Sequence, residues 1–388
     1  MRHAKSGAWW DNNPHRALAN NSVSYAEKPD SVSFMREWMA LVESGSGERG
    51  IFNREASKKQ AAKYGRRDSD WEFGTNPCSE IILRPYQFCN LTEVVVRATD
   101  DIESLSRKVR LATILGTIQS TFTKFPYLRK VWQRNTEEER LLGVSLTGIM
   151  DNPLMTTANK GLEKTLETLR KLAVDTNTLW ADRLGIPTSA AITCVKPSGT
   201  VSQLVDSASG IHARHSKYYI RTVRGDNKDP LTQFMKDQGV PSEPDVMKPD
   251  ATTVFSFPVQ SPTNAVVTSD LSAIEQLQTW LMYQRHWCEH KPSITVNVKK
   301  DEWFAVGAFV YEHFDEMSGV SFLPYNEHTY QQAPYQDVGK HDYKTLLSLM
   351  PKTIDWSKLS SYEEEDNTAG SQTMACSGDV CEIVDIGA

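Results

Sequence analysis

A carboxamide, a thiol and a carboxyl group stand at alternate positions along the stretch 75–80, as Asn76, Cys78 and Glu80. Side chains of an extended backbone alternate between two faces, so these three groups would project to the same side. A helix is excluded because Pro77 lacks a backbone N–H and keeps the preceding residue out of the helical region. We therefore expect an extended loop that offers the three groups to one small ligand. The alternative is an ordinary buried cysteine beside a surface glutamate.

A second thiol, Cys89, follows eleven residues after the first. The apolar runs 81–83 and 94–96 are typical of strands, and a turn near 84–87 would join them by a short connection. Pairing of these two strands would bring Cys78 and Cys89 near each other. Two thiols and a carboxylate around one pocket suit one-electron or redox chemistry better than hydrolysis.

The two stretches, Asn-Pro-Cys-Ser-Glu at 76–80 and Phe-Cys-Asn-Leu-Thr-Glu-Val at 88–94, resemble the active-site finger loop of ribonucleotide reductases. They are most similar to the monomeric, adenosylcobalamin-dependent (class II) ribonucleoside-triphosphate reductases. The resemblance implies an α/β fold, the C-terminal part of a ten-stranded α/β barrel of the glycyl/thiyl radical enzyme type. The finger loop, at about 75–93, would run through the centre of that barrel.

The resemblance also implies a role for each residue. Cys78 would carry a transient thiyl radical and take the 3′ hydrogen of the ribose, and Glu80 would act as base on the 3′-hydroxyl. Asn76 would hydrogen-bond the sugar hydroxyls, and Cys89 would be one of two thiols that supply reducing equivalents. The radical would come from adenosylcobalamin, and part of the cobalamin pocket is expected around 255–300 and 325–345.

The elements that must position this loop are predicted from periodicity and end signals. Apolar residues at helical spacing predict helices over 31–46, 102–125 and 160–184, with Gly45 and Gly185 ending the first and the last. The largely apolar run 190–195 predicts a buried strand, and we expect its thiol, Cys194, to lie in the core.

A loop rich in small and hydroxyl residues follows that strand, in the run Lys-Pro-Ser-Gly-Thr-Val-Ser at 196–202. A strand that leads into such a loop commonly presents backbone N–H groups and hydroxyls to a phosphate, although an ordinary turn is the alternative. In the family that this chain resembles, the corresponding loop holds the substrate phosphates. The residues that would do so here are Pro197, Ser198, Gly199, Thr200 and Val201.

The last stretch, 363–388, is acidic and rich in small residues, which predicts a flexible tail after a catalytic portion at 1–362. Cys376 and Cys381 lie in it, and a turn at Gly378 would let them close to a disulfide. Half of a zinc site is the alternative, but no second pair of cysteines is near in sequence. The resemblance implies a shuttle pair that re-reduces the active site and is recharged by thioredoxin or a similar dithiol.

Two further patterns are weighed against simpler interpretations. His286, Cys288 and His290 suggest a metal site, but on a helix the middle residue points away from the other two, so we expect no metal there. Tyr218 and Tyr219 resemble the tyrosine pair of reductases that borrow a radical from a separate subunit. They lie too early in the chain for that role, which favours a cobalamin enzyme over an iron-dependent one, and we interpret them as strand packing.

The chain has 388 residues, a formal net charge of −6 and six cysteines. This charge argues against nucleic-acid binding. No apolar run suggests a membrane span or a signal peptide. The cysteine content predicts a cytoplasmic protein rather than a disulfide scaffold.

The segment 19–25 resembles a part of the family that lies in the middle of a full-length reductase, and residues 1–77 contain no cysteine to pair with Cys89. We therefore expect the C-terminal half of a reductase that needs an N-terminal half on another polypeptide and does not turn over alone. The remaining alternatives are the large subunit of an iron-dependent (class I) reductase, a non-catalytic remnant and a zinc-bound thiol protein.

Overall fold

The structure, a computed structural model, describes residues 4, 13–16, 22–45, 50–157, 159–325, 331–363, 372–377 and 380–385. The α-helices are α2 (Ser31–Ser44), α3 (Arg54–Ala62), α4 (Ile102–Gln119), α5 (Lys130–Glu139), α6 (Leu162–Leu184), α7 (Gly199–Leu204), α8 (Pro230–Asp237), α9 (Ala273–His286), α10 (Trp303–Glu312) and α11 (Lys340–Leu349). Short 3-10 helices lie at Pro14–Arg16, Ile149–Asp151, Pro153–Met155, Thr268–Asp270 and Trp356–Ser361.

The strands are β1 (Val23–Tyr25), β2 (Gly50–Asn53), β3 (Gly74–Thr75), β4 (Ile82–Leu83), β5 (Asn90–Val95), β6 (Leu142–Thr147), β7 (Tyr218–Asp226), β8 (Ser242–Pro244), β9 (Thr252–Gln260), β10 (Thr295–Val298), β11 (Gly319–Pro324), β12 (Tyr335–Asp337), β13 (Gln372–Ser377) and β14 (Val380–Asp385). Among the helices just given, none is both long enough and apolar enough to cross a membrane.

Local signals set most helix ends where the sequence predicts them. Asp30 accepts hydrogen bonds from the first turn of α2, and Gly45 ends that helix in the left-handed conformation at φ 59°. Gly185 ends α6 in the same way. The predicted helix 102–125 is too long, because α4 stops at Gln119. There the hydroxyls of Ser120 and Thr121 donate to carbonyls of the last turn and compete with the helical pattern.

Parallel strands form the part of the fold that carries the site. β5 pairs with β6 in a six-residue parallel register, and β10 pairs with β11 in parallel. The segment 191–195 lies between these two pairs and is joined to them by the parallel bridges Val144 to Thr193 and Val195 to Pro292. It is buried as predicted, although it forms only isolated bridges and not a continuous strand. The result is a wall of five parallel segments in the order β5, β6, 191–195, 292–298 and β11.

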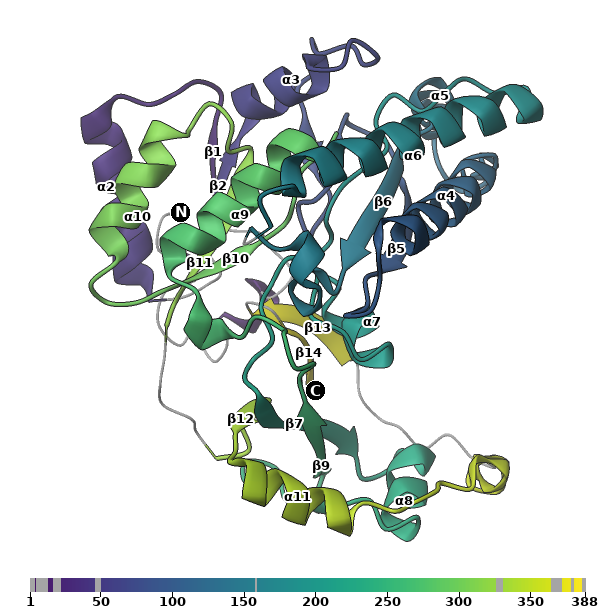
Figure 1. Ribbon diagram of the computed structural model, residues 1–388, viewed down its shortest axis with the longest axis vertical. Coiled ribbons are helices and arrows are strands. Elements are labelled where there is room, and N and C mark those ends of the chain that lie inside the picture. The colour runs from purple at the N-terminus through teal and green to yellow at the C-terminus, as the bar shows by residue number, and fades with distance from the viewer. Residues whose placement is uncertain are drawn as a thin grey trace.

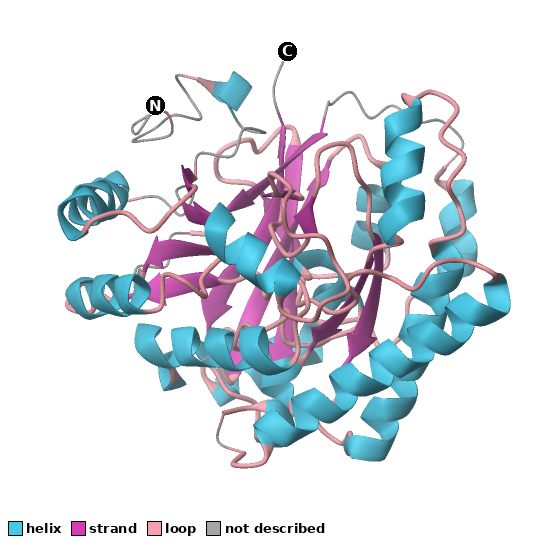
Figure 2. Ribbon diagram, turned by 90° about the horizontal axis from the view of Figure 1, so that it is seen from above, coloured by secondary structure: helices cyan, strands magenta, loops and turns pink. Residues whose placement is uncertain are grey.

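The wall continues through β2, which pairs antiparallel with β11, to β1. Figure 2 shows the strands in the middle of the molecule and helices along its outside. The core between them includes Trp280 and Tyr283 of α9, both fully buried. Within the described residues the wall ends at β5 and at β1, so the predicted ten-stranded barrel is not closed. The mixed α/β class is confirmed.

A second four-stranded sheet has the order β12-β7-β9-β8 and is antiparallel throughout. Figure 1 shows it with α8 and α11 at the lower end of the molecule, apart from β10 and β11. Tyr218 and Tyr219 lie at the start of its strand β7, where their rings contact Tyr343 and Tyr335. This is the strand packing expected from the sequence.

Candidate thiol site

The loop that carries the first thiol turns instead of running extended. Within the stretch 76–79, the Ser79 N–H donates to the Asn76 carbonyl at 2.9 Å, and Ser79 has φ 66°. Pro77 occupies the second position of this turn, which its fixed φ favours. The prediction of an extended backbone for this loop is therefore wrong. Asn76 Oδ1 accepts the Ile81 N–H at 3.0 Å, so its carboxamide oxygen closes the loop.

The predicted hairpin between 81–83 and 94–96 is also wrong. β4 is two residues long and pairs with β3, on the other side of the thiol turn. β5 pairs instead with β6, in parallel and along its whole length. Cys78 and Cys89 therefore reach the site from two separate sheets.

The segment 290–293, which precedes β10, anchors the loop to the wall. Ser293 Oγ donates to the Cys78 carbonyl at 2.6 Å, and the Lys291 N–H donates to the Glu80 carbonyl at 3.2 Å. His290 Nδ1 accepts the Ile82 N–H at 3.3 Å while its Nε2 donates to the wall at 2.9 Å. Burial, helped by a nearby arginine, lowers the pKa of His290 to about 3, so the ring is neutral and bridges loop and wall.

Glu80 is fully buried, and its charge is met by Lys196 from the end of the segment 191–195. Lys196 Nζ lies 3.4 Å from Glu80 Oε1, and the same ammonium hydrogen-bonds Cys78. Burial acts to lower the pKa of Lys196, but Glu80 and Cys78 outweigh it and the pKa is raised. Glu80 Oε2 is buried with no hydrogen-bond partner among the described residues. An unpaired carboxylate oxygen in a buried site is a ready acceptor for a ligand hydroxyl.

A second lysine, Lys291, lies under the loop. Its side chain is fully buried, and its Nζ donates to Ser79 Oγ at 3.1 Å. Burial lowers the pKa of Lys291 to about 8, although Glu80 acts in the opposite direction. Gly319 of β11 makes room for this side chain, since a Cβ there would lie 2.8 Å from Lys291 Nζ.

The second thiol, Cys89, is half-buried just before β5. Burial, helped by the charge of Glu80, raises the pKa of Cys89 to about 12, so this thiol keeps its proton at neutral pH. Cys78 and Cys89 thus share the Glu80–Lys196 pair as a neighbour. Cys194 is fully buried, as predicted, and burial raises its pKa further.

The predicted phosphate loop begins α7, with Gly199 as the first helical residue and Thr200 exposed. Ser198 precedes the helix at φ 57°, and its hydroxyl donates to the carboxylate of Glu93. Ser145 donates to the same carboxylate at 3.1 Å, and burial raises the pKa of Glu93. The Ser198 hydroxyl therefore faces the interior, and backbone groups at 199–201 form the outer part of the loop.

The other predicted sites are less complete. Cys376 of β13 and Cys381 of β14 are register partners in an antiparallel pairing, while the turn expected at Gly378 lies outside the described residues.

His286 and His290, considered for a metal, do not converge. His286 Nδ1 lies 3.0 Å from Glu167 at the surface, whereas His290 is buried under the loop.

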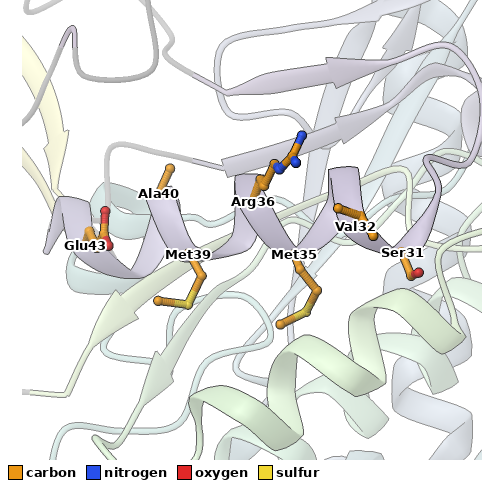
Figure 3. Close-up of a pocket in the computed structure, with 7 residues that line it drawn as sticks. All are labelled: Ser31, Val32, Met35, Arg36, Met39, Ala40 and Glu43. Carbon is orange, nitrogen blue, oxygen red and sulfur yellow. The ribbon is translucent and has the colours of Figure 1, made fainter.

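An open groove of about 630 Å³ lies along α2 and contains none of the predicted site residues (Figure 3). Met35 and Met39 project to the same side of that helix. The residues that line the groove are Ser31, Val32, Met35, Arg36, Met39, Ala40 and Glu43. We assign no chemistry to this groove.

Four site residues were missed by sequence reasoning: Lys196, Lys291, Glu93 and Ser293. Lys291 left a signal, because a lysine at the start of a buried strand is rare unless it has a polar partner. Glu93 and Ser293 left none, since only the pairing of distant segments brings their side chains to the loop.

Fold and site define a mixed α/β protein with two thiols around a buried carboxylate. No family model matches the chain. The chain is 29% identical over 405 residues to the adenosylcobalamin-dependent ribonucleoside-triphosphate reductase of Lactobacillus gasseri, covering 95% of this chain and 53% of that protein. Identity to the reductase of the same name from Euglena gracilis is 27% over 390 residues, with coverage of 96% and 51%.

Solved structures agree on the fold. A crystal structure of a B12-dependent (class II) ribonucleotide reductase superposes with a TM-score of 0.77 at 24% identity, over 93% of this chain and 54% of that one. The α subunit of the Actinobacillus ureae class Id ribonucleotide reductase gives 0.52 at 14% identity, over 78% and 64%. The chain is a homologue of the class II, B12-dependent ribonucleotide reductases, and it spans about half the length of the curated relatives it matches.

Proposed function

We propose that this chain carries the thiol site of an adenosylcobalamin-dependent ribonucleoside-triphosphate reductase, which converts ribonucleotides to 2′-deoxyribonucleotides by a thiyl-radical mechanism. The observation that supports this most directly is the buried carboxylate of Glu80, which lies 3.4 Å from Lys196; that ammonium hydrogen-bonds Cys78, and the charge of Glu80 acts on the pKa of Cys89. These residues lie in the stretches that resemble the reductase finger loop.

In this proposal each group has a defined role, and the hydrogen atoms, protons and electrons of the steps balance. Cys78, as a thiyl radical, takes the 3′ hydrogen of the ribose and later returns it. Glu80 accepts the proton of the 3′-hydroxyl, for which its unpaired Oε2 is free. The 2′-hydroxyl leaves as water, and Cys89 with a second thiol supplies two electrons and two protons as the pair closes to a disulfide. The high pKa of Cys89 suits this step, because the thiol arrives protonated.

The second thiol and part of the sheet are assigned to the portion of the relatives that this chain does not cover. Of the other cysteines whose side chains are described, Cys194 and Cys288 are both fully buried, so neither is an accessible partner for Cys89. In the same way, strands from that portion would pair with the open edges β5 and β1 and close the ten-stranded barrel around the loop.

Adenosylcobalamin, when bound, supplies the organic radical that such chemistry needs. Cys78 is half-exposed and is the thiol of this chain suited to receive it. The residues around 255–300 do not enclose a corrin ring by themselves. The cavity beside them, against Ile294 and Asn297, holds only about 20 Å³. Residues 326–330 of the other expected stretch lie outside the described residues. We therefore derive no step through the cofactor.

Cys376 and Cys381 are proposed as the pair that re-reduces the active-site disulfide. Their register pairing places the two Cα positions opposite each other, and contacts between α7 and β14 bring their hairpin beside the proposed phosphate loop (Figure 1). A thioredoxin-type dithiol would then exchange with this pair at the surface.

The test is conversion of a ribonucleoside triphosphate to its deoxy form by the chain assembled with the polypeptide portion that its relatives add. With adenosylcobalamin and a dithiol the assembly should turn over, and the tritium of a 3′-tritiated substrate should be found at C3′ of the deoxy product, because the hydrogen is returned. Cys78→Ala should abolish both signals, while Cys194→Ala, a matched cysteine in the core, should retain them. Activity that ignores cobalamin but needs a radical-bearing subunit would favour the iron-dependent class, and an active Cys78→Ala variant would refute the proposal.

A further inference from the structure

Lys196 is held at a fixed point between the thiol turn and the proposed phosphate loop. Its backbone N–H donates to Ser145 Oγ at 2.8 Å. Its carbonyl packs so closely on Gly210 that a Cβ there would lie 2.3 Å from the oxygen. The side chain starts from this fixed backbone, and 30% of it is exposed. It therefore stands at the opening of the site, while Glu80 is fully buried behind it.

The ammonium of Lys196 contacts two groups that the proposed chemistry uses. One contact is the 3.4 Å approach to Glu80 Oε1, and the other is the hydrogen bond to the thiol of Cys78. A carboxylate with no exposed surface would take up a proton without a nearby cation, and a neutral acid is a poor base. An N–H group that donates to sulfur occupies a lone pair, which leaves the S–H hydrogen to point elsewhere.

The other cation in reach cannot replace it. Lys291 is hydrogen-bonded to Ser79 on the buried side of the loop, and burial lowers its pKa to about 8. A fraction of its charge is therefore lost just above neutral pH. Among the described residues, Lys196 is the cation that combines a raised pKa with a contact to Glu80 and Cys78.

We propose that Lys196 is a positioning residue of the thiol site, which holds its positive charge against the carboxylate of Glu80 and orients the Cys78 thiol through one ammonium group. The catalytic consequence rests on the function proposed above, whereas the placement of the ammonium between carboxylate and thiol does not. The two parts can therefore fail separately.

The placement is tested by alkylation of Cys78 in the full chain with iodoacetamide, followed by mass spectrometry of the peptide that contains it. Lys196→Met should slow this reaction by about threefold to tenfold, because the thiolate loses its cation and keeps the Glu80 anion. Lys196→Arg keeps the charge and should stay within about twofold of the parent. If Lys196→Met does not fold, Lys196→Gln makes the same test.

A matched control is Lys108→Met. The Lys108 side chain is 31% exposed and pairs with Asp100, so it has the same burial and the same kind of ion pair away from the loop. This variant should leave the alkylation rate of Cys78 unchanged. Equal rates for Lys196→Met and the parent chain would overturn the proposal.

The catalytic part is tested in the assembly described above by the pH dependence of kcat/KM. Lys196→Met should move the acidic limb to higher pH, and Lys196→Arg should restore it. An unmoved limb would overturn the proposed action on Glu80, even where alkylation supports the contact with Cys78. No turnover by the unmodified assembly would instead refute the proposed function, and the alkylation rates would still decide the placement.

Discussion

Replacing Lys291 by methionine should stabilise the folded chain at neutral pH and destabilise it at alkaline pH. The lysine is fully buried, and its pKa falls from 10.5 to about 8 in the folded chain. Between these two values the unfolded chain binds more protons than the folded one, so the contribution of Lys291 to stability increases as the pH rises. Below about pH 8 the folded chain carries the full cost of a buried charge.

The size of that cost follows from the same two values. At about 1.4 kcal/mol for each pH unit, the fall from 10.5 to about 8 corresponds to roughly 3 kcal/mol. Methionine removes this cost but also the hydrogen bond to Ser79, which contributes about 1 kcal/mol. Lys291→Met should therefore be about 2 kcal/mol more stable than the parent near pH 7, and about 1 kcal/mol less stable above pH 10.5.

The assay is urea unfolding followed by tryptophan fluorescence at several pH values across this range. The difference in free energy of unfolding between variant and parent at each pH removes the contributions of the other titrating groups in the chain. Lys171→Met is the control, since its side chain is 75% exposed and its removal should not change the slope of stability against pH. If the free energies of unfolding of Lys291→Met and the parent differ by the same amount from neutral to alkaline pH, the ammonium is not buried as described.

Three further outcomes are expected. Gly319→Ala should lower stability by about 1 to 3 kcal/mol in thermal unfolding, because its Cβ would lie 2.8 Å from Lys291 Nζ; no loss would mean that the lysine moves freely. In the assembly, Cys78→Ala should reduce turnover to background, whereas Cys194→Ala should keep turnover and lose only about 1 kcal/mol of stability. Cys376→Ser should lose turnover driven by thioredoxin but keep turnover driven by a small dithiol, and equal loss with both reductants would argue against a shuttle.

Features set by neighbouring residues could be predicted from the sequence. Gly45 and Gly185 end their helices because a left-handed residue costs glycine little, and this preference does not depend on the rest of the fold. Cys78 and Glu80 could be proposed as site residues for a similar reason, since they lie two residues apart in a recognisable stretch. Burial of Cys194 followed from the apolar run around it.

Features set by distant pairing could not be predicted. The run 81–83 was assigned to the wrong partner, because β4 pairs with β3 across the thiol turn while β5 pairs with β6, which begins about fifty residues later in the chain. Nothing within the hairpin-like stretch records the pairing of β5 with so distant a strand. Lys196 and Lys291 were missed for the same reason, since they reach the loop from the segment 191–195 and from the start of the strand region 291–298. Their contacts exist only once the parallel wall has formed.

The two lysines differ in how they lie relative to the buried carboxylate of Glu80. Glu80 carries one negative charge, which can offset the burial of one ammonium but not of two. Lys196 lies nearer the surface and contacts that carboxylate, so its pKa is raised, whereas Lys291 is sealed under Ser79 and its pKa falls to about 8. The site therefore has one fixed cation and one that can lose its proton. Ser79 and Ser293 anchor the loop through hydrogen bonds that do not require charge. Loss of the Lys291 proton therefore does not by itself release Cys78.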